Sequence, residues 1–253
     1  MSPRRIRAVA RRVVAQFRRD RRSIALLLVA PILVLSLVGA IWGTKTLPGS
    51  GRTVLDDLAP ALVAFFAFFF IFLLAAVAFL RERTSGTLER LLATPLRRGE
   101  LVAGYLAGFS LFALLQALVI IVFTVAVLRI HYQGNVATIF LIEAVLVVGA
   151  VSLGLAVSAF ARNELQAVQF VPLILLPQVF LSGLLVPVDQ LPDLLRPIAA
   201  VLPLTYANEA LRSVMIDGAG LTDGLVLRDL GLLAGFALLT ATAAVRSIRR
   251  EVA

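Results

Sequence analysis

The sequence predicts an all-α integral membrane protein with six transmembrane helices. Its 253 residues are 60% hydrophobic, with a mean hydropathy of +0.97, well above the roughly 45–50% apolar content of soluble domains. Apolar runs of about 20 residues recur along the chain, and a helix needs that length to cross a hydrocarbon core about 30 Å thick. The six expected spans cover residues 24–42, 60–80, 101–128, 137–160, 165–186 and 225–245.

Residues 1–22 predict a separate amphipathic helix that lies on the membrane interface before the six-span domain of residues 23–253. Apolar side chains recur at helical spacing, and arginines fill most of the other positions. The apolar set is Ile6, Val9, Ala10, Val13 and Phe17. The nine arginines of this stretch favour an anionic membrane surface, so lipid is an expected partner. A basic tail without a helix is the alternative.

The first span is expected to remain as an anchor. Its apolar run is longer than that of a typical cleaved signal peptide, and no clear cleavage site closes it.

Basic residues indicate the orientation of the spans. If the N-terminus is cytoplasmic, 18 lysines and arginines lie on the cytoplasmic side and six lie outside. The excess of positive charge on the inner side predicts that both termini lie in the cytoplasm. We therefore expect a multi-pass protein of the plasma (cell inner) membrane.

Composition argues against several function classes. The chain has no cysteine and one histidine, so neither a thiolate nor a histidine-rich metal site is expected. The net charge of +9 lies beside membrane spans rather than on a soluble face, so nucleic acid is not an expected partner. No phosphate-binding G-x-x-x-x-G-K-[ST] motif and no Ser/His/Asp set occur, so no catalytic residue is predicted.

The segment RERTSGTLERLLATPLRRGE, residues 81–100, lies between the second and third expected spans. Gly86 can cap a helix of about two turns from Thr87 to Ala93, with Glu89 near its positive end. Thr94 precedes Pro95, which ends the helix. Leu88, Leu91 and Leu92 share one face, and Glu89 and Arg90 point away.

Two turns do not form a stable helix alone in water, so a further surface must bury the three leucines. The lipid headgroup region is one such surface. A hydrophobic groove on a cytoplasmic partner is the other, and the residues alone do not choose between them.

Polar residues inside spans are candidates for a substrate path or for hydrogen bonds between helices. Glu143, in the outer third of the fourth span, is expected to face the bundle interior. Pro172 and Pro177 are expected to kink the fifth span. The candidate path residues are Glu143, Gln116, Gln169, Gln178 and Phe69, the last within the run FFAFFFIF.

The region of residues 187–224 is divided by prolines into pieces too short to span a membrane. It predicts one or two short helices at the outer membrane surface, or else an ordinary packed external loop. Thr205 is expected to cap one of these helices, and Glu209 is expected to pair with Arg212. Its expected apolar face consists of Ala207, Ala210, Leu211 and Val214.

The stretch RERTSGTLERLLATPLRRGELVAGYL resembles the cytoplasmic signature of the ABC-2 membrane family, the permease subunits of ATP-binding-cassette exporters. The stretch FLSGLLVPVDQLPDLLRPIAAVLPLTYANEALR is similar to the external region of that family. The resemblance is closer to the drug and antibiotic branch than to polysaccharide exporters.

This resemblance implies a coupling helix that docks on an ATPase subunit and re-entrant outer helices over residues 187–217. It also implies a second permease, identical or different, with ATP and Mg bound by the partner and no cofactor bound by this chain. The implied cargo is lipophilic or amphipathic. The implied docking residues are Gly86, Thr87, Leu88, Glu89, Arg90, Leu91, Leu92 and Pro95.

Two other functions stay open at this point. One is an ATP-independent membrane carrier or lipid-modifying membrane protein, with Glu143 as its protonatable site. The other is a membrane anchor without a transport path.

Overall fold

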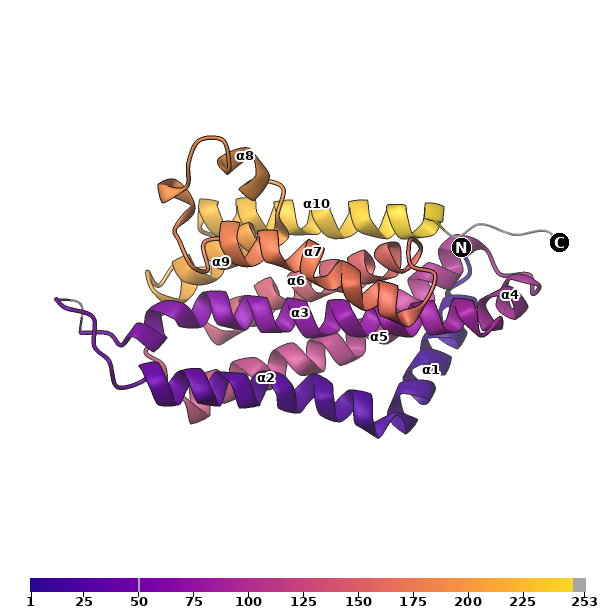
Figure 1. The fold of residues 1–253 in the computed structure, drawn as a ribbon, viewed down its shortest axis with the longest axis horizontal. Coiled ribbons are helices and arrows are strands. Elements are labelled where there is room, and N and C mark those ends of the chain that lie inside the picture. Colours follow the sequence, from indigo (N-terminus) through magenta and orange to yellow (C-terminus); the bar gives the residue numbers. More distant parts are fainter. Residues whose placement is uncertain (50, 248–253) are drawn as a thin grey trace.

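The structure, a computed structural model, describes residues 1–49 and 51–247. In chain order its elements are α1 (Pro3–Arg19), α2 (Arg21–Trp42), α3 (Val54–Thr84), α4 (Thr87–Leu92), α5 (Arg98–Val122), the π-helix η1 (Phe123–Val127), α6 (Val136–Ser158), α7 (Glu164–Leu181), the 3-10 helix η2 (Val188–Gln190), α8 (Arg196–Ala199), α9 (Pro203–Met215) and α10 (Gly224–Ser247). Long helices run along the long axis of the molecule, and α1 crosses them steeply at one end, called here the α1 end (Figure 1).

The prediction of six spans is confirmed. Within the described residues, α2, α3, α5 with η1, α6, α7 and α10 are each long and apolar enough to cross a membrane. The same residues contain no β-strand beyond one isolated bridge between Thr46 and Thr53. The fold is therefore all-α, as expected.

The two largest differences from the predicted span boundaries lie at the start of the second span and the end of the fifth. The second span begins at Val54 rather than at residue 60 because Thr53 and Asp56 form a capping box, in which each side chain bonds the other's backbone N–H. The fifth span ends at Leu181 rather than at residue 186, and Gly183 follows it with a left-handed φ of 84°. α7 continues through both of its prolines. The basic C-terminal residues 248–253 lie outside the described residues.

Helix α6 forms the centre of the bundle and packs against α3, α5, α9 and α10. Gly154 permits its close approach to α3, since a Cβ there would lie 2.7 Å from the carbonyl oxygen of Phe72. On another side of α6, the Thr240 hydroxyl lies 3.1 Å from that of Ser152 and joins it to α10. Small and hydroxyl-bearing residues at such contacts are typical of helix packing in membranes.

The helix α9 belongs to the region of residues 187–224. It is inserted between the long helices rather than lying on a surface. Its predicted apolar face is confirmed, because all four side chains, Ala207, Ala210, Leu211 and Val214, are fully buried. Thr205 does not cap it, because the helix already begins at Pro203, and a proline is well suited to the first turn. The Thr205 hydroxyl donates instead to the carbonyl of Ala199.

The predicted pairing of Glu209 with Arg212 is wrong. Arg212 binds Asp57 of α3 at 2.7 Å, and Glu209 binds Arg228 of α10 at 2.9 Å. Because α9 is packed among other helices, charged residues on those helices lie closer than its own next turn. The Arg228 guanidinium also lies 2.8 Å from Asp229, and both charges lie within α10, which begins at Gly224.

The amphipathic helix expected over residues 1–22 is present as α1, but its apolar face packs on protein. Val9, Val13 and Phe17 are buried, and α1 lies against α5. Gly104 and Gly108 of α5 permit this approach, because a Cβ at either position would lie 2.7 Å or less from a valine Cβ of α1. Most of the arginines are exposed, whereas the large apolar side chains Val9, Val13 and Phe17 are not.

Replacing Gly104 with alanine should detach α1 from α5, because the new Cβ would lie 2.5 Å from the Cβ of Val9. We expect a lower unfolding temperature in detergent and faster trypsin cleavage within residues 1–22. The matched control is Gly235→Ala on α10, where nothing lies within 4 Å, and where alanine gains up to about 1 kcal/mol in helix propensity. Equal trypsin resistance of both variants would show that the contact is not required.

Candidate functional site

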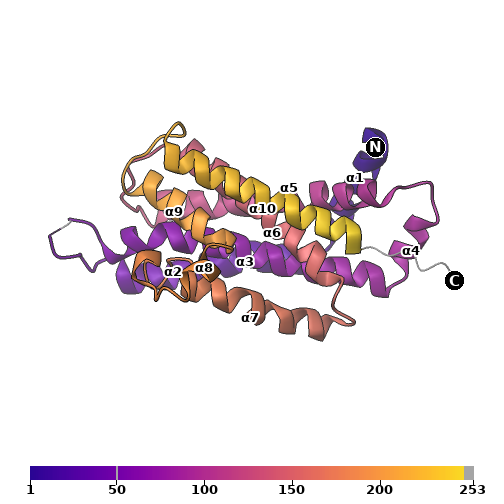
Figure 2. The same ribbon diagram turned by 90° about the horizontal axis from the view of Figure 1, so that it is seen from above.

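The α4 segment, residues 85–97, lies beyond the ends of α3 and α5 at the α1 end (Figures 1 and 2). As predicted, Gly86 is the N-cap, and its left-handed φ of 69° reverses the chain after α3. The helix is short, from Thr87 to Leu92. After it, the Thr94 hydroxyl donates to the carbonyl of Leu91 at 2.6 Å, and Pro95 prevents continuation.

The chain's own bundle covers part of the leucine face. Leu88 is only 6% exposed and belongs to the hydrophobic core, and Leu91 packs partly against that core. The two surfaces considered from the sequence, lipid and a partner groove, therefore need not bury Leu88, because α4 folds back against α3. The side chain of Leu92 lies outside the described part of the structure. The exposed residues of the segment include the polar Glu89, Arg90 and Thr94, together with Pro95.

The first turns of α1 are bonded to the residues that follow α4. The backbone N–H of Ser2 donates to Oε1 of Glu100 at 2.6 Å, and the Arg5 guanidinium donates to the carbonyl of Pro95 at 2.6 Å. Arg5 also lies 3.5 Å from Oε2 of Glu100, which is buried in the first turn of α5. The N-terminus of α1 is thus attached where α5 begins.

The middle of α1 is bonded to the residues that precede α4. The Arg12 guanidinium donates to both oxygens of Glu82, at 2.9 and 3.2 Å, and to the hydroxyl of Tyr105 at 3.1 Å. Burial lowers the pKa of Arg12, but the hydrogen bond and charge of Glu82 outweigh this effect, so its pKa is raised and the cation persists. Glu82 lies in the last turns of α3, and Tyr105 lies on α5.

α1 therefore connects both flanks of the α4 segment. One set of bonds reaches Glu82 before it, and another reaches Pro95 and Glu100 after it. The side chains of Glu82 and Tyr105 are buried, so these bonds form in surroundings that strengthen charge interactions. A displacement of α4 would act on α3, α5 and α1 together.

Sequence reasoning missed Arg12, Glu82, Glu100 and Tyr105. A signal was present, because Glu82 and Glu100 are carboxylates beside spans in a segment rich in arginine. Only the crossing of α1 over α5 brings Arg12 between Glu82 and Tyr105, and that crossing joins residues 70 and 93 positions apart.

Two of the candidate path residues form hydrogen bonds that join one helix to another. The Gln116 side chain donates to the carbonyl of Phe66 at 3.1 Å and joins α5 to α3. Gln178 accepts from the backbone N–H of Leu204 at 3.3 Å and so satisfies a first-turn donor of α9. Their interpretation as contacts between helices is consistent with these bonds.

The other three candidates lie apart from these bonds. Gln169 is exposed on α7, and Phe69 is half-buried on α3, stacked on Phe65 with ring centres 5.7 Å apart. Glu143 is fully buried on α6, and neither of its carboxylate oxygens has a hydrogen-bond partner among the described residues. As expected, Glu143 faces the bundle interior.

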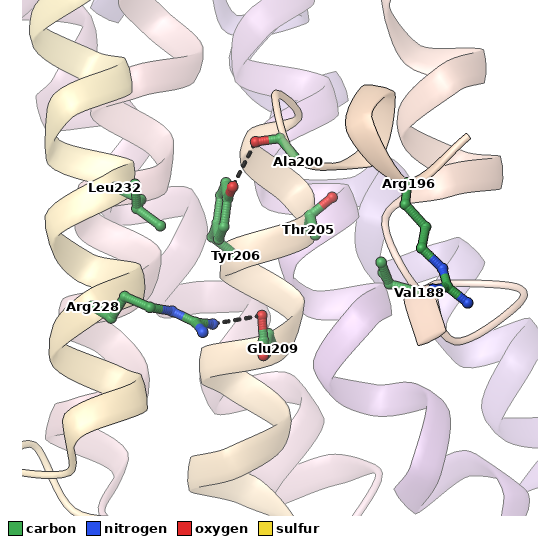
Figure 3. A pocket seen from close by; sticks show the side chains of 8 residues that line it. All are labelled: Val188, Arg196, Ala200, Thr205, Tyr206, Glu209, Arg228 and Leu232. Atoms are coloured by element: carbon green, nitrogen blue, oxygen red, sulfur yellow. Dashed lines mark hydrogen bonds and ion pairs between the residues drawn. The ribbon is translucent and has the colours of Figure 1, made fainter. Parts of the chain in front are cut away.

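A shallow pocket of about 340 Å³ lies between α8, α9 and α10 at the opposite end (Figure 3). Each of its charged side chains already has a bonding partner within the protein. Arg228 reaches across to Glu209, whereas Arg196 points away from that pair and donates to the carbonyls of Asp189 and Leu191. This pairing disfavours the pocket as a site for a charged ligand.

Replacing Arg12 with glutamine should destabilise the protein by about 2 kcal/mol, because the buried Glu82 loses a charged hydrogen-bond partner. The neighbouring Arg11, which is exposed, provides the control, and Arg11→Gln should change stability by less than about 0.5 kcal/mol. Unfolding in detergent measures both. The double variant with Glu82→Gln should lose less than the sum of the single changes; strict additivity would contradict the pairing.

A family model described as ABC-2 type transporter matches residues 4–216, which include α1, α4 and the flanking helices. The chain is 32% identical over 179 residues, 70% of its length, to ABC transporter G family member 20 of Dictyostelium discoideum, of which the match covers 24%.

Two bacterial relatives are also similar. Linearmycin resistance permease protein LnrN of Bacillus subtilis is 29% identical over 69% of this chain and 45% of its own length. The probable multidrug ABC transporter permease YbhS of Escherichia coli is 28% identical over 58% of this chain and 39% of its own length. The chain thus matches less than half of each of these three relatives. With the family model covering most of its residues, the chain belongs to the ABC-2 type transporter family.

Proposed function

We propose that this chain is the membrane-spanning permease subunit of an exporter that is powered by ATP hydrolysis on a separate subunit. Its cargo is a lipophilic or amphipathic compound of the drug, antibiotic or lipid-like class. It resides in the plasma membrane with both termini in the cytoplasm, so the α1 end is cytoplasmic. ATP and Mg are bound by the ATPase subunit and not by this chain.

The observation that carries this proposal is the α4 segment. It is a two-turn helix held to the bundle by Leu88, with Glu89 and Arg90 directed outward. The bundle buries Leu88 and so stabilises this short helix, which leaves Glu89 and Arg90 exposed beyond the ends of α3 and α5 (Figure 1), where a partner can contact them. A displacement of α4 would be transmitted directly to α3 and α5, because only a few residues of chain separate α4 from each of them.

The predicted docking residues therefore divide into two groups by role. Leu88 and Gly86 position the segment, the first through the core and the second through its left-handed backbone. Glu89, Arg90 and Pro95 are exposed and provide the contact surface.

The cargo path is proposed to form between two permease chains. α2 and α7 lie at the edge of the single bundle, and only small parts of their apolar surfaces are buried in it. Phe65 and Phe69 of α3, which are half-buried and stacked on each other, would provide an aromatic part of the path's wall, and exposed Gln169 of α7 would add a polar group elsewhere along it. Such a lining suits lipophilic molecules. The names of the relatives LnrN, a linearmycin resistance permease, and YbhS, a probable multidrug permease, support a cargo of this class.

The carrier alternative depends on Glu143. A proton-carrying site needs access to water or substrate. In this chain Glu143 lies on α6 and is fully buried within one bundle by the neighbouring helices, so it does not lie on an uncovered face. That placement favours the exporter.

Reversing the exposed charges of α4 with Glu89→Lys and Arg90→Glu should weaken co-purification of the ATPase subunit about tenfold or more, because opposite charges at the contact become like charges. Insertion and thermal stability of the permease should not change, since both side chains are exposed. Arg162→Glu, an exposed charge in the loop between α6 and α7, is the control. Unchanged co-purification in the double variant would contradict the docking role.

Leu88→Asp should act differently, because it places a carboxylate in the core. We expect a lower unfolding temperature of the isolated permease, by an amount equivalent to at least about 2 kcal/mol. Unfolding of the permease alone in detergent distinguishes this effect from loss of partner contact.

Glu143→Gln should leave ATP-driven transport intact and keep or raise stability, by up to about 2 kcal/mol, because a neutral amide is less costly to bury than an ionised carboxylate without a hydrogen-bond partner. Transport in vesicles that contain the ATPase, together with thermal unfolding, measures both effects. A folded variant that no longer transports would favour the carrier alternative instead.

A further inference from the structure

The helix α1 has three faces with different surroundings. Val9, Val13 and Phe17 are buried against the bundle, and Arg5 and Arg12 are bonded to the flanks of the α4 segment. A third face carries a row of exposed arginines spaced three, four and seven residues apart, which places them on one side of a helix. The arginine row consists of Arg4, Arg7, Arg11 and Arg18.

No ion pair involves the arginine row within the described residues. The acidic residue nearest in the chain, Asp20, is already in use: its carboxylate accepts from the Ser23 hydroxyl at 2.6 Å and from the Ser23 backbone N–H at 3.1 Å. These hydrogen bonds lower the pKa of Asp20 and commit it to capping α2. The row is therefore a concentrated positive charge without a compensating anion in the described chain.

The position of α1 relative to the spans indicates which anion it meets. α1 is followed directly by the spanning helix α2, whose exposed apolar side chains begin with Leu26. Arg18 lies eight residues before Leu26, and Gly104, where α1 contacts α5, lies six residues, roughly 9 Å, inside the start of α5. The row therefore lies beside the bundle at the depth of the lipid headgroups, not beyond it.

We propose that the arginine row of α1 is a binding site for the phosphate groups of acidic phospholipids. Guanidinium groups bind phosphate oxygens by charge-assisted hydrogen bonds, often bidentate. Because α5 already covers the apolar face, α1 is held in place by protein, and its contact with lipid is electrostatic rather than insertion of an apolar face. Acidic lipid at the row would hold α1, and through Arg5 and Arg12 the flanks of α4, in the observed arrangement.

The test uses the permease alone, so its result does not depend on the proposed function. The protein is placed in mixed micelles of phosphatidylglycerol and phosphatidylcholine, and the retained lipids are counted by native mass spectrometry. The wild-type protein should retain phosphatidylglycerol in preference to phosphatidylcholine. Arg4→Gln, Arg7→Gln and Arg11→Gln together should reduce that preference strongly, by roughly fivefold for each arginine at low salt. Added salt should reduce the wild-type preference as well.

The charge-preserving variant with lysine at the same three positions is the matched control and should retain most of the preference. If the triple variant misfolds, the single variant Arg11→Gln still tests the row. Its control is Arg162→Gln, in the loop between α6 and α7 on the same side of the membrane. Two outcomes would overturn the proposal: an unchanged lipid preference in the glutamine variant, or an equal loss in the lysine variant. If a separate pull-down showed lost ATPase binding while lipid retention was unchanged, the proposal would be overturned too, and the row would be assigned to the partner protein.

Discussion

A hydrocarbon core contains no water to pair with polar groups, and this constraint governs the placement of polar side chains in the bundle. Gln116 donates to a carbonyl of α3, and Gln178 accepts from the first turn of α9. Arg212 and Arg228 bind carboxylates on neighbouring helices. In each case a polar group that the bilayer would penalise joins two helices. Glu143 departs from the pattern, because its carboxylate has no partner among the described residues.

Burial of carboxylates within the protein, rather than in lipid, explains the dense bonding around α4. At the end of α3, Glu82 is buried, and Arg12 of α1 supplies its opposite charge from 70 residues away. At the start of α5, Glu100 is buried and is bonded by Ser2 and Arg5. Together these bonds make α1 a brace for the segment that the proposed ATPase would contact. A rigid connection at this point would pass a displacement of α4 to the spans rather than lose it in a flexible loop.

The division of α1 into three faces links the proposed transport function to the membrane itself. One face is fixed to α5 by valines that fit against Gly104 and Gly108. A second holds the flanks of α4, and the third carries unpaired arginines. Lipid charge and motion of the coupling segment would thus act on the same short helix.

Much of the architecture was predictable because it follows from local patterns. Span number, the existence of α1, the Gly86 cap, the proline stop and the apolar face of α9 all depend on residues within a few turns of one another. Periodicity and composition report such features directly. Membership in a permease family likewise rested on two contiguous stretches of sequence.

The partners of polar and apolar faces were not predictable in this way. From the sequence, Glu209 was paired with the nearest arginine in its helix, and Leu88 was assigned to a surface outside the chain. The apolar face of α1 was likewise assigned to lipid. In the tertiary structure, Glu209 forms an ion pair with Arg228, and Leu88 is buried in the bundle core. The apolar face of α1 packs against α5. A sequence by itself determined which faces of this protein must be covered; only packing decided what covers them, because the competing surfaces come from residues far apart in the chain.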